Sequence, residues 1–254
     1  MMILAAWCIC TRPFAYIRHS RNTRGDMSAS YLAYIICSVL SFIPAIVLHE
    51  ASHAFAAYKL GDQTAKGAGR LSFNPLRHID PFGTVILPLI LMAMNMPVFG
   101  YAKPVPYNPR YFKDPRKGDL IVGLAGPLAN LLMALLAALV GWLLVSFAPI
   151  MQWIYASVVF RYFFLYFLPL FALINLYLMF FNLLPIPPLD GSSIFAFFLP
   201  EKYLPKYYQV QQYAFPVFMI VVILLPQFMR VDPFSWYLSV TAGNVYSLLF
   251  PYMG

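Results

Sequence analysis

The stretch YLAYIICSVLSFIPAIVLHEASHAFAAY, residues 31–58, is the most informative part of the chain, because it joins a charge-free apolar run to two histidines and a glutamate. The run from Tyr31 to Leu48 approaches the roughly 20 residues that a transmembrane helix requires. His49 and His53 lie four residues apart, so on a helix their side chains lie one above the other and can offer two imidazole nitrogens to one cation. The sequence therefore predicts a membrane helix that ends in a metal site.

Glu50, between the two histidines, is placed to activate water. Its side chain points one step around the helix, where a carboxylate can act as general base without taking a coordination position. This is how zinc hydrolases use the HExxH pattern. A metal-binding membrane transporter or an inactive scaffold could use the same cluster without hydrolysis. A transporter would be expected to carry several polar clusters along a path, whereas this chain shows a single one.

The composition is that of a membrane protein. Apolar residues make up 61% and charged residues 10% of the 254 residues, far from the values of soluble proteins. We expect an all-α polytopic membrane protein with five or six transmembrane helices and short membrane-associated strands or a re-entrant segment. The apolar runs behind this expectation cover residues 31–58, 84–99, 120–148, 162–184, 207–226 and 234–250.

The domain organisation follows from the same pattern, since no long polar stretch interrupts the apolar runs. We expect residues 27–254 to form a single intramembrane domain and residues 1–26 to be a flexible extension. The net charge of +8 comes from Lys and Arg that occur singly or in short loop clusters, so no nucleic-acid partner is expected. The three cysteines lack CxxC spacing, which argues against a disulfide framework and a thiolate zinc site.

Asp190 is the candidate for a third metal ligand, because a catalytic zinc usually takes three protein ligands. It follows the helix-breaking stretch NLLPIPPL at 182–189 and precedes Gly191. A carboxylate at membrane depth costs on the order of 3 kcal/mol unless a partner such as a divalent cation compensates it. His78 is expected to hydrogen-bond a loop. The remaining acidic candidates are expected to be solvated charges or helix caps: Asp62, Asp114, Asp119, Asp232 and Glu201.

Three motifs in order resemble the site-2 protease family of intramembrane zinc metalloproteases, in the compact form of its bacterial and archaeal members. The resemblance spans roughly Tyr31 to Pro200 and includes no PDZ or CBS domain, so it leaves open how a substrate is chosen. The motifs are HEASH at 49–53, GLAGPLAN at 123–130 and NLLPIPPLDG at 182–191, with GRLSFNPLRHIDPFG at 69–83 and AKPVPYNP at 102–109 as further similar stretches.

The resemblance implies an endopeptidase that hydrolyses peptide bonds in or near transmembrane segments of membrane proteins, in a bacterial or archaeal cell membrane. Its partners would be the lipid bilayer and a transmembrane protein substrate of unknown identity. The resemblance implies that one zinc ion is bound by His49, His53 and Asp190. It also implies that Glu50 activates water, and that Asn182 positions the substrate or stabilises the oxyanion.

The order of crossings predicts the side on which the site opens. Ligands that end the first helix and follow the 162–184 run must meet at one depth. The short run 84–99 is therefore expected to be re-entrant, unless a further crossing lies within 149–161. The loop Lys and Arg then share one face, which the positive-inside rule labels cytoplasmic. A strand near 71–74 is expected to pair with an unwound substrate by edge addition.

Overall fold

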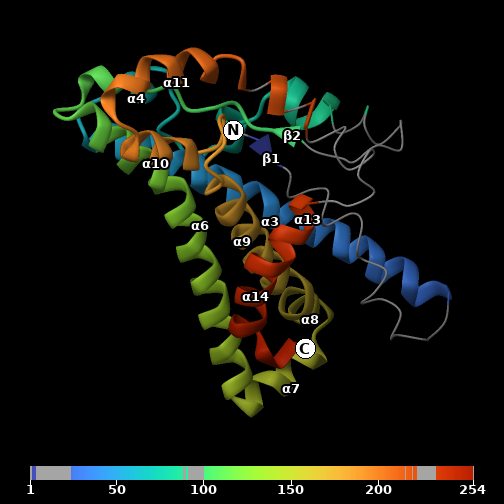
Figure 1. Ribbon diagram of the computed structural model, residues 1–254. Coiled ribbons are helices and arrows are strands. Elements are labelled where there is room, and N and C mark those ends of the chain that lie inside the picture. The colour runs from blue at the N-terminus through green and yellow to red at the C-terminus, as the bar shows by residue number, and fades with distance from the viewer. Residues whose placement is uncertain are drawn as a thin grey trace.

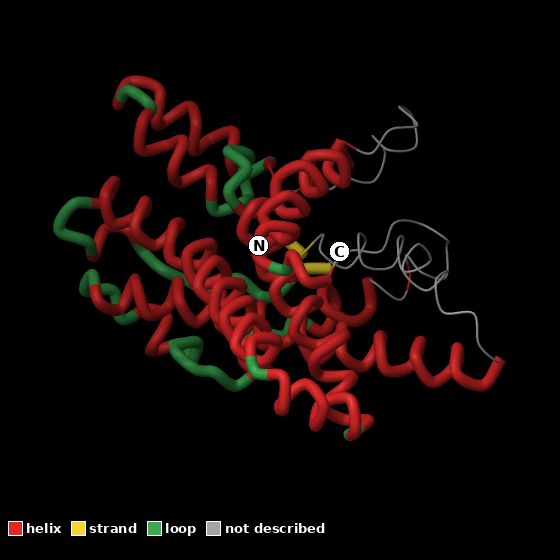
Figure 2. Tube along the Cα trace, turned by 90° about the horizontal axis from the view of Figure 1, so that it is seen from below, coloured by secondary structure: helices red, strands yellow, loops and turns green. Residues whose placement is uncertain are grey.

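The computed structural model describes residues 2–3, 24–87, 90, 100–214, 216–218, 220–221 and 233–253, and these are mostly helical (Figure 1). Most of the expected extension, residues 1–26, and most of the expected re-entrant run, 84–99, lie outside the described residues. Figure 2 shows the described trace as helices joined by short loops.

The elements keep their order along the chain. Two short strands pair antiparallel, with Met2 opposite Tyr101; they are β1 (Met2–Ile3) and β2 (Gly100–Tyr101). The α-helices are α3 (Arg24–Lys59), α4 (Thr64–Gly67), α6 (Pro115–Ser146), α7 (Ala148–Ala156), α8 (Val158–Tyr162), α9 (Leu168–Asn182), α10 (Gly191–Phe198), α11 (Leu204–Gln211), α13 (Pro233–Leu238) and α14 (Asn244–Leu249). Tighter or wider helical turns cover Pro75–Arg77, Pro81–Ile86, Pro109–Tyr111, Phe163–Phe167, Glu201–Tyr203, Ser239–Gly243 and Pro251–Met253.

Three segments are long and apolar enough to cross a membrane, namely Leu32–Lys59, Pro115–Ser146 and Val158–Asn182. They match three of the apolar runs and confirm a helical membrane protein, while five or six crossings stays a prediction. Their outer surfaces expose large apolar side chains, as lipid contact requires. Examples are Leu32, Ile36, Val39, Leu40, Leu128, Leu132, Leu136, Leu139, Val158 and Val159.

The helices α6 and α9 run in opposite directions, and α7 and α8 connect them at the end far from β2 (Figure 1). Helix α6 begins at Pro115 because the Asp114 side chain accepts a hydrogen bond from the Lys117 N–H at 3.1 Å and because proline suits the first helical position. Helix α7 has 9 residues and is about 14 Å long, too short to cross a bilayer. Residues 149–161 therefore provide no helix long enough for a further crossing.

The core lies where α3, α6 and α9 pack against one another. Small side chains of α6 allow the close approach, as is usual between membrane helices. The largest cluster includes Ala134, Ala137, Ala138, Leu168, Ala172, Leu176 and Phe250, all of them buried.

The connection between α9 and α10 turns back sharply. Helix α9 ends at Asn182, and prolines 185, 187 and 188 follow, which cannot continue a helix. A Cβ atom on Gly191 would lie 2.4 Å from the carbonyl oxygens of both Leu183 and Leu184, so the return requires glycine. This return places Asp190, at the start of α10, beside α6.

The expected strand at 71–74 is wrong, since the structure has bends there, followed by the turn Pro75–Arg77. Local side chains occupy the backbone groups that a strand would use. Ser72 Oγ accepts from the Asn74 N–H at 3.1 Å, and Asn74 Oδ1 accepts from the Leu76 N–H at 3.0 Å. Short polar side chains of this kind compete with ladder pairing.

Candidate metal centre

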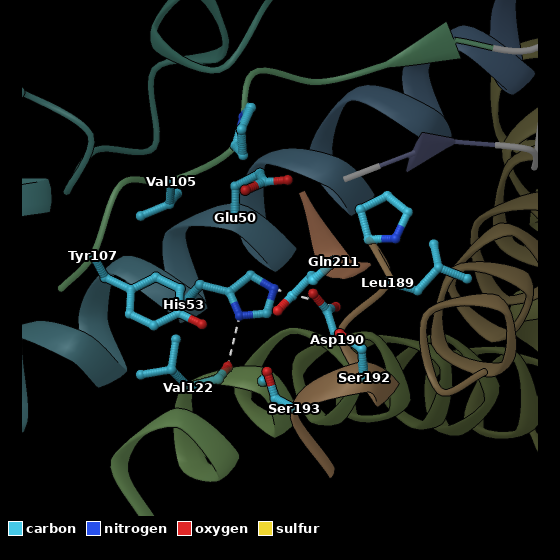
Figure 3. Close-up of a pocket in the computed structure, with 13 residues that line it drawn as sticks. Glu50, His53, Val105, Tyr107, Val122, Leu189, Asp190, Ser192, Ser193 and Gln211 are labelled. Carbon is cyan, nitrogen blue, oxygen red and sulfur yellow. Dashed lines mark hydrogen bonds and ion pairs between the residues drawn. The ribbon is translucent and has the colours of Figure 1, made fainter. Parts of the chain in front are cut away.

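His49, His53 and Asp190 converge from the end of α3 and the start of α10. The Nε2 atoms of the two histidines lie 3.0 Å apart, and Asp190 Oδ2 lies 3.1 Å from His49 Nε2 and 3.4 Å from His53 Nε2. Figure 3 shows the His53 ring and the Asp190 carboxylate facing each other. The structure thus brings together the three expected ligands. Among the described residues they form the single such group of His, Cys, Asp or Glu side chains.

The other nitrogen of each ring is held by an oxygen acceptor. His49 Nδ1 bonds to Asn130 Oδ1, and His53 Nδ1 donates to the Val122 carbonyl at 2.7 Å. Each Nδ1 must therefore carry the proton in the neutral ring, which leaves the lone pair on Nε2. Both rings consequently present their lone pairs toward Asp190.

The amide of Asn130 has a defined orientation. Its Nδ2 donates to Asn175 Oδ1 at 2.7 Å and to the Ala45 carbonyl at 3.4 Å, so its Oδ1 is the atom that faces His49. Asn175 Nδ2 in turn donates to the Phe171 carbonyl at 2.7 Å. Asn130 and Asn175 thus bridge α3, α6 and α9 as buried polar residues, and they also fix the tautomer of a candidate ligand.

The donor set fits zinc. Two neutral imidazole lone pairs and a carboxylate oxygen within 3.4 Å of one another repel unless a cation lies between them. In a tetrahedral site with zinc–ligand distances of about 2.0–2.2 Å, the ligand atoms lie about 3.3–3.5 Å apart. The observed separations of 3.0, 3.1 and 3.4 Å are close to those values.

Gly126 lies directly against both imidazoles. A Cβ atom at this position would lie 2.4 Å from His53 Nε2 and 2.5 Å from His49 Nε2. Helix α6 can therefore approach the end of α3 because residue 126 has no side chain. The glycines of the GLAGPLAN motif permit close packing, as their small size predicts, and this one packs on the ligands themselves.

Glu50 is 1% exposed and, within the described part of the chain, its Oε1 has no hydrogen-bond partner. It lines a cavity of about 140 Å³ together with His53 and Asp190, and this volume has room for several waters (Figure 3). A buried carboxylate oxygen without a protein partner calls for a water or an ion. Its position beside the ligand group is the one a general base needs.

Asn182 is fully buried at the end of α9, and the structure does not bring its amide into this cavity. Its Nδ2 donates to the Leu178 carbonyl at 2.9 Å within its own helix. Its Oδ1 has no partner among the described residues.

The pair Tyr107 and Asp119 was missed by sequence reasoning. The Tyr107 hydroxyl donates to Asp119 Oδ1 at 2.6 Å, and the tyrosine lines the cavity with Ser193. Burial and the neighbouring Asp119 carboxylate raise the pKa of Tyr107 above its ordinary value. The expectation of a solvated charge or cap at Asp119 is therefore wrong, because the fold covers it with the AKPVPYNP stretch. The AKPVPYNP stretch was the one feature of the sequence that could have indicated this pair.

His78 and the other acidic residues that the structure describes lie outside the candidate metal centre. His78 Nε2 lies 2.8 Å from the Ser72 carbonyl, which confirms its role in a loop. Asp114 caps α6, and Glu201 has an 86% exposed side chain. Asp62 is buried rather than solvated and accepts hydrogen bonds within its loops. Residue 232 lies outside the described residues.

Comparison with known proteins gives consistent matches. The model of peptidase family M50 matches residues 37–225. A Bacillus subtilis protein named "Putative zinc metalloprotease YwhC" is 38% identical over 183 residues, which cover 72% of this chain and 78% of the relative. Proteins named "Putative zinc metalloprotease Rip2" from Mycolicibacterium smegmatis and Mycobacterium tuberculosis are 31% and 32% identical, and the matches cover 69% and 70% of those relatives and 77% and 78% of this chain. No solved structure matches the chain.

Proposed function

Because the chain belongs to peptidase family M50, the site-2 proteases, we propose that its zinc ion is held by His49, His53 and Asp190 and that Glu50 is its general base. The protein is an intramembrane zinc metalloprotease. The observation that supports these roles is the convergence of Asp190 Oδ2 on both Nε2 atoms at 3.1 and 3.4 Å, with Glu50 beside them.

The residues around the site have separate roles in peptide hydrolysis. Zinc bound to the three ligands would supply Lewis acidity, which polarises the scissile carbonyl and lowers the pKa of a water toward about 7. Glu50 accepts the proton of the attacking water and returns it to the leaving amine. Asn130 and the Val122 carbonyl keep each Nδ1 protonated, so that each Nε2 stays available as a ligand atom. The cavity admits the water that a lipid interior lacks.

Asn182 is proposed to position the substrate or stabilise the oxyanion, as the family motif implies. This role requires its side chain to leave the Leu178 carbonyl and turn toward the cavity. The unpartnered Oδ1 makes its present hydrogen bonding incomplete, which favours such a change.

The active site is proposed to open toward the cytoplasm of a bacterial or archaeal cell, in a chain that crosses the membrane several times. Support comes from charge, since the segments around the metal centre carry most of the loop cations. They are Lys59, Lys66, Arg70, Arg77, Lys103, Arg110, Lys113, Arg116 and Lys117. Figure 1 places α4 and the start of α6 at the same end as α10.

The substrate is proposed to be a transmembrane protein that is cut in or near its membrane segment. The exposed apolar surface of the spanning helices and the burial of the metal centre support this proposal, because a substrate segment must reach the site from the lipid. A transporter is not favoured, since the described residues hold one ligand cluster and no second one along a path.

The general base can be tested with a synthetic probe peptide of about 25 apolar residues, matched to a membrane span, with a central Asn–Gly pair and a fluorophore and quencher at its ends. Glu50→Gln should keep its zinc while cleavage falls by about 10²–10⁴-fold. Glu201→Gln changes the other glutamate of the chain, which is exposed, and should cleave normally. Equal turnover by Glu50→Gln and the unchanged protein would exclude Glu50 as the base.

A further inference from the structure

Gln211, the last residue of α11, lines two cavities. It lines the polar cavity that Glu50 and Asp190 also line, and Figure 3 draws it among the side chains around that cavity. It also lines a second cavity of about 430 Å³. The walls of the second cavity are mostly apolar or aromatic and include Ile186, Pro187, Tyr207, Val210, Val217 and Phe218.

The carboxamide of Gln211 makes no hydrogen bond with the residues that the structure describes. A glutamine side chain carries an N–H donor and a carbonyl acceptor in the same planar arrangement as a peptide unit. It can therefore pair with one peptide unit of another chain through two hydrogen bonds. Asn182 has the same groups, but its donor is bonded to Leu178 and it does not line the cavity.

A peptide that is cut at the metal centre needs such a partner. To expose its scissile bond, a membrane segment must unwind, and its N–H and C=O groups then lose their helical hydrogen bonds. Each group left unpaired away from water costs free energy. Because an extended chain advances about 3.3 Å per residue, it passes beyond the small polar cavity within a few residues. The neighbouring apolar cavity suits the side chains of such a segment, and Gln211 lines both cavities.

We infer that Gln211 is a substrate-binding residue whose carboxamide pairs with the peptide unit next to the scissile bond. The inference rests on the proposed function, since it requires a peptide at the metal centre. The paired peptide unit is not altered by the reaction, so its hydrogen bonds are equally strong in the bound substrate and in the transition state. Such uniform binding lowers KM and leaves kcat unchanged.

The test compares Gln211→Met with Gln212→Met in the full chain loaded with zinc. Methionine keeps the length of the side chain and removes both hydrogen-bonding groups. Gln212 is the next residue, is exposed and lines neither cavity, which makes it a matched control. With the probe peptide, Gln211→Met should raise KM about tenfold, with kcat within about twofold. Its zinc content and melting temperature should match the unchanged protein, and Gln212→Met should behave like the unchanged protein throughout.

A binding measurement separates this inference from the proposed base. Fluorescence anisotropy of the labelled probe peptide should show that Glu50→Gln/Gln211→Met binds it about tenfold more weakly than Glu50→Gln alone. Equal affinities, an unchanged KM in Gln211→Met or the same loss in Gln212→Met would overturn the role of Gln211 while leaving the metal centre intact. Full-rate cleavage by Glu50→Gln would instead remove the proposed base, and the affinity comparison would still decide the role of Gln211.

Discussion

His49 and Asn130 face each other across the packed helices α3 and α6, and Asn130 Oδ1 accepts the hydrogen bond from His49 Nδ1. The amide cannot be reversed without loss, because its Nδ2 donates to two carbonyl-type oxygens, on Asn175 and Ala45. A polar residue that joins three helices in the core thus also sets which nitrogen of His49 presents its lone pair at the metal centre.

Asn130→Ala should weaken zinc binding about 10–100-fold, because the His49 ring loses the acceptor that fixes its tautomer and orientation. Competition with a chromogenic chelator measures the dissociation constant directly. Asn130→Asp keeps an acceptor oxygen and should recover most of the affinity. Asn175 lies one hydrogen bond further from the His49 ring, so Asn175→Ala should weaken zinc binding less. Wild-type zinc affinity in Asn130→Ala would show that His49 does not depend on this contact.

Gly126→Ala should prevent most zinc binding, while the protein still folds. The added methyl would lie 2.4–2.5 Å from the two Nε2 atoms, so the imidazoles or α6 must move away. Zinc per protein molecule, measured by mass spectrometry of the metal, should fall well below one. Gly67→Ala is the control, since a Cβ there meets nothing within 4 Å. Full zinc content in Gly126→Ala would contradict the packing described for α6.

Asp62 should make stability depend on pH. Burial alone would raise the pKa of Asp62, but hydrogen bonds from Thr64 and from the Asn108 N–H, at 2.6 Å, outweigh it and hold the pKa below its ordinary value. A carboxyl with a lowered pKa in the folded state stabilises the protein above its unfolded-state pKa of about 4, and this contribution is lost as the pH falls below that value.

The substitution that tests this is Asp62→Asn, which should cost about 1–3 kcal/mol at pH 7. Melting curves of the variant and the unchanged protein should differ most at pH 7 and converge as the pH falls below about 4. A difference that stays constant across this range would show that the charge of Asp62 is not what stabilises the loops.

The sequence was sufficient for three long apolar helices and for the three side chains that converge at the candidate metal centre, because both depend on local patterns. A charge-free run before His49 predicts a membrane helix, and a spacing of four places His53 above it. Asp190 could be chosen because a carboxylate after a proline-rich break at membrane depth needs compensation. The structure brings the Asp190 carboxylate to within 3.1 and 3.4 Å of the two Nε2 atoms.

What could not be predicted depends on contacts between distant segments. Tyr107 and Asp119 pair only because the loop before α6 folds over the start of that helix. No residue spacing in the sequence predicts this contact. The expected strand at 71–74 failed because short polar side chains bond to the local backbone. Gln211 lines the same cavity as Asp190 through the placement of α11, which hydrophobic periodicity does not determine.

X-ray absorption at the zinc edge of the purified full chain measures whether His49, His53 and Asp190 bind one zinc ion. The purified chain should hold one zinc, with two imidazole ligands at about 2.0–2.1 Å, oxygen in the remaining positions and no sulfur. Asp190→Ala should lose most of the zinc, whereas Cys37→Ala should keep it. A spectrum with sulfur ligands, or one that His49→Ala and Asp190→Ala leave unchanged, would show that these three residues do not bind the zinc.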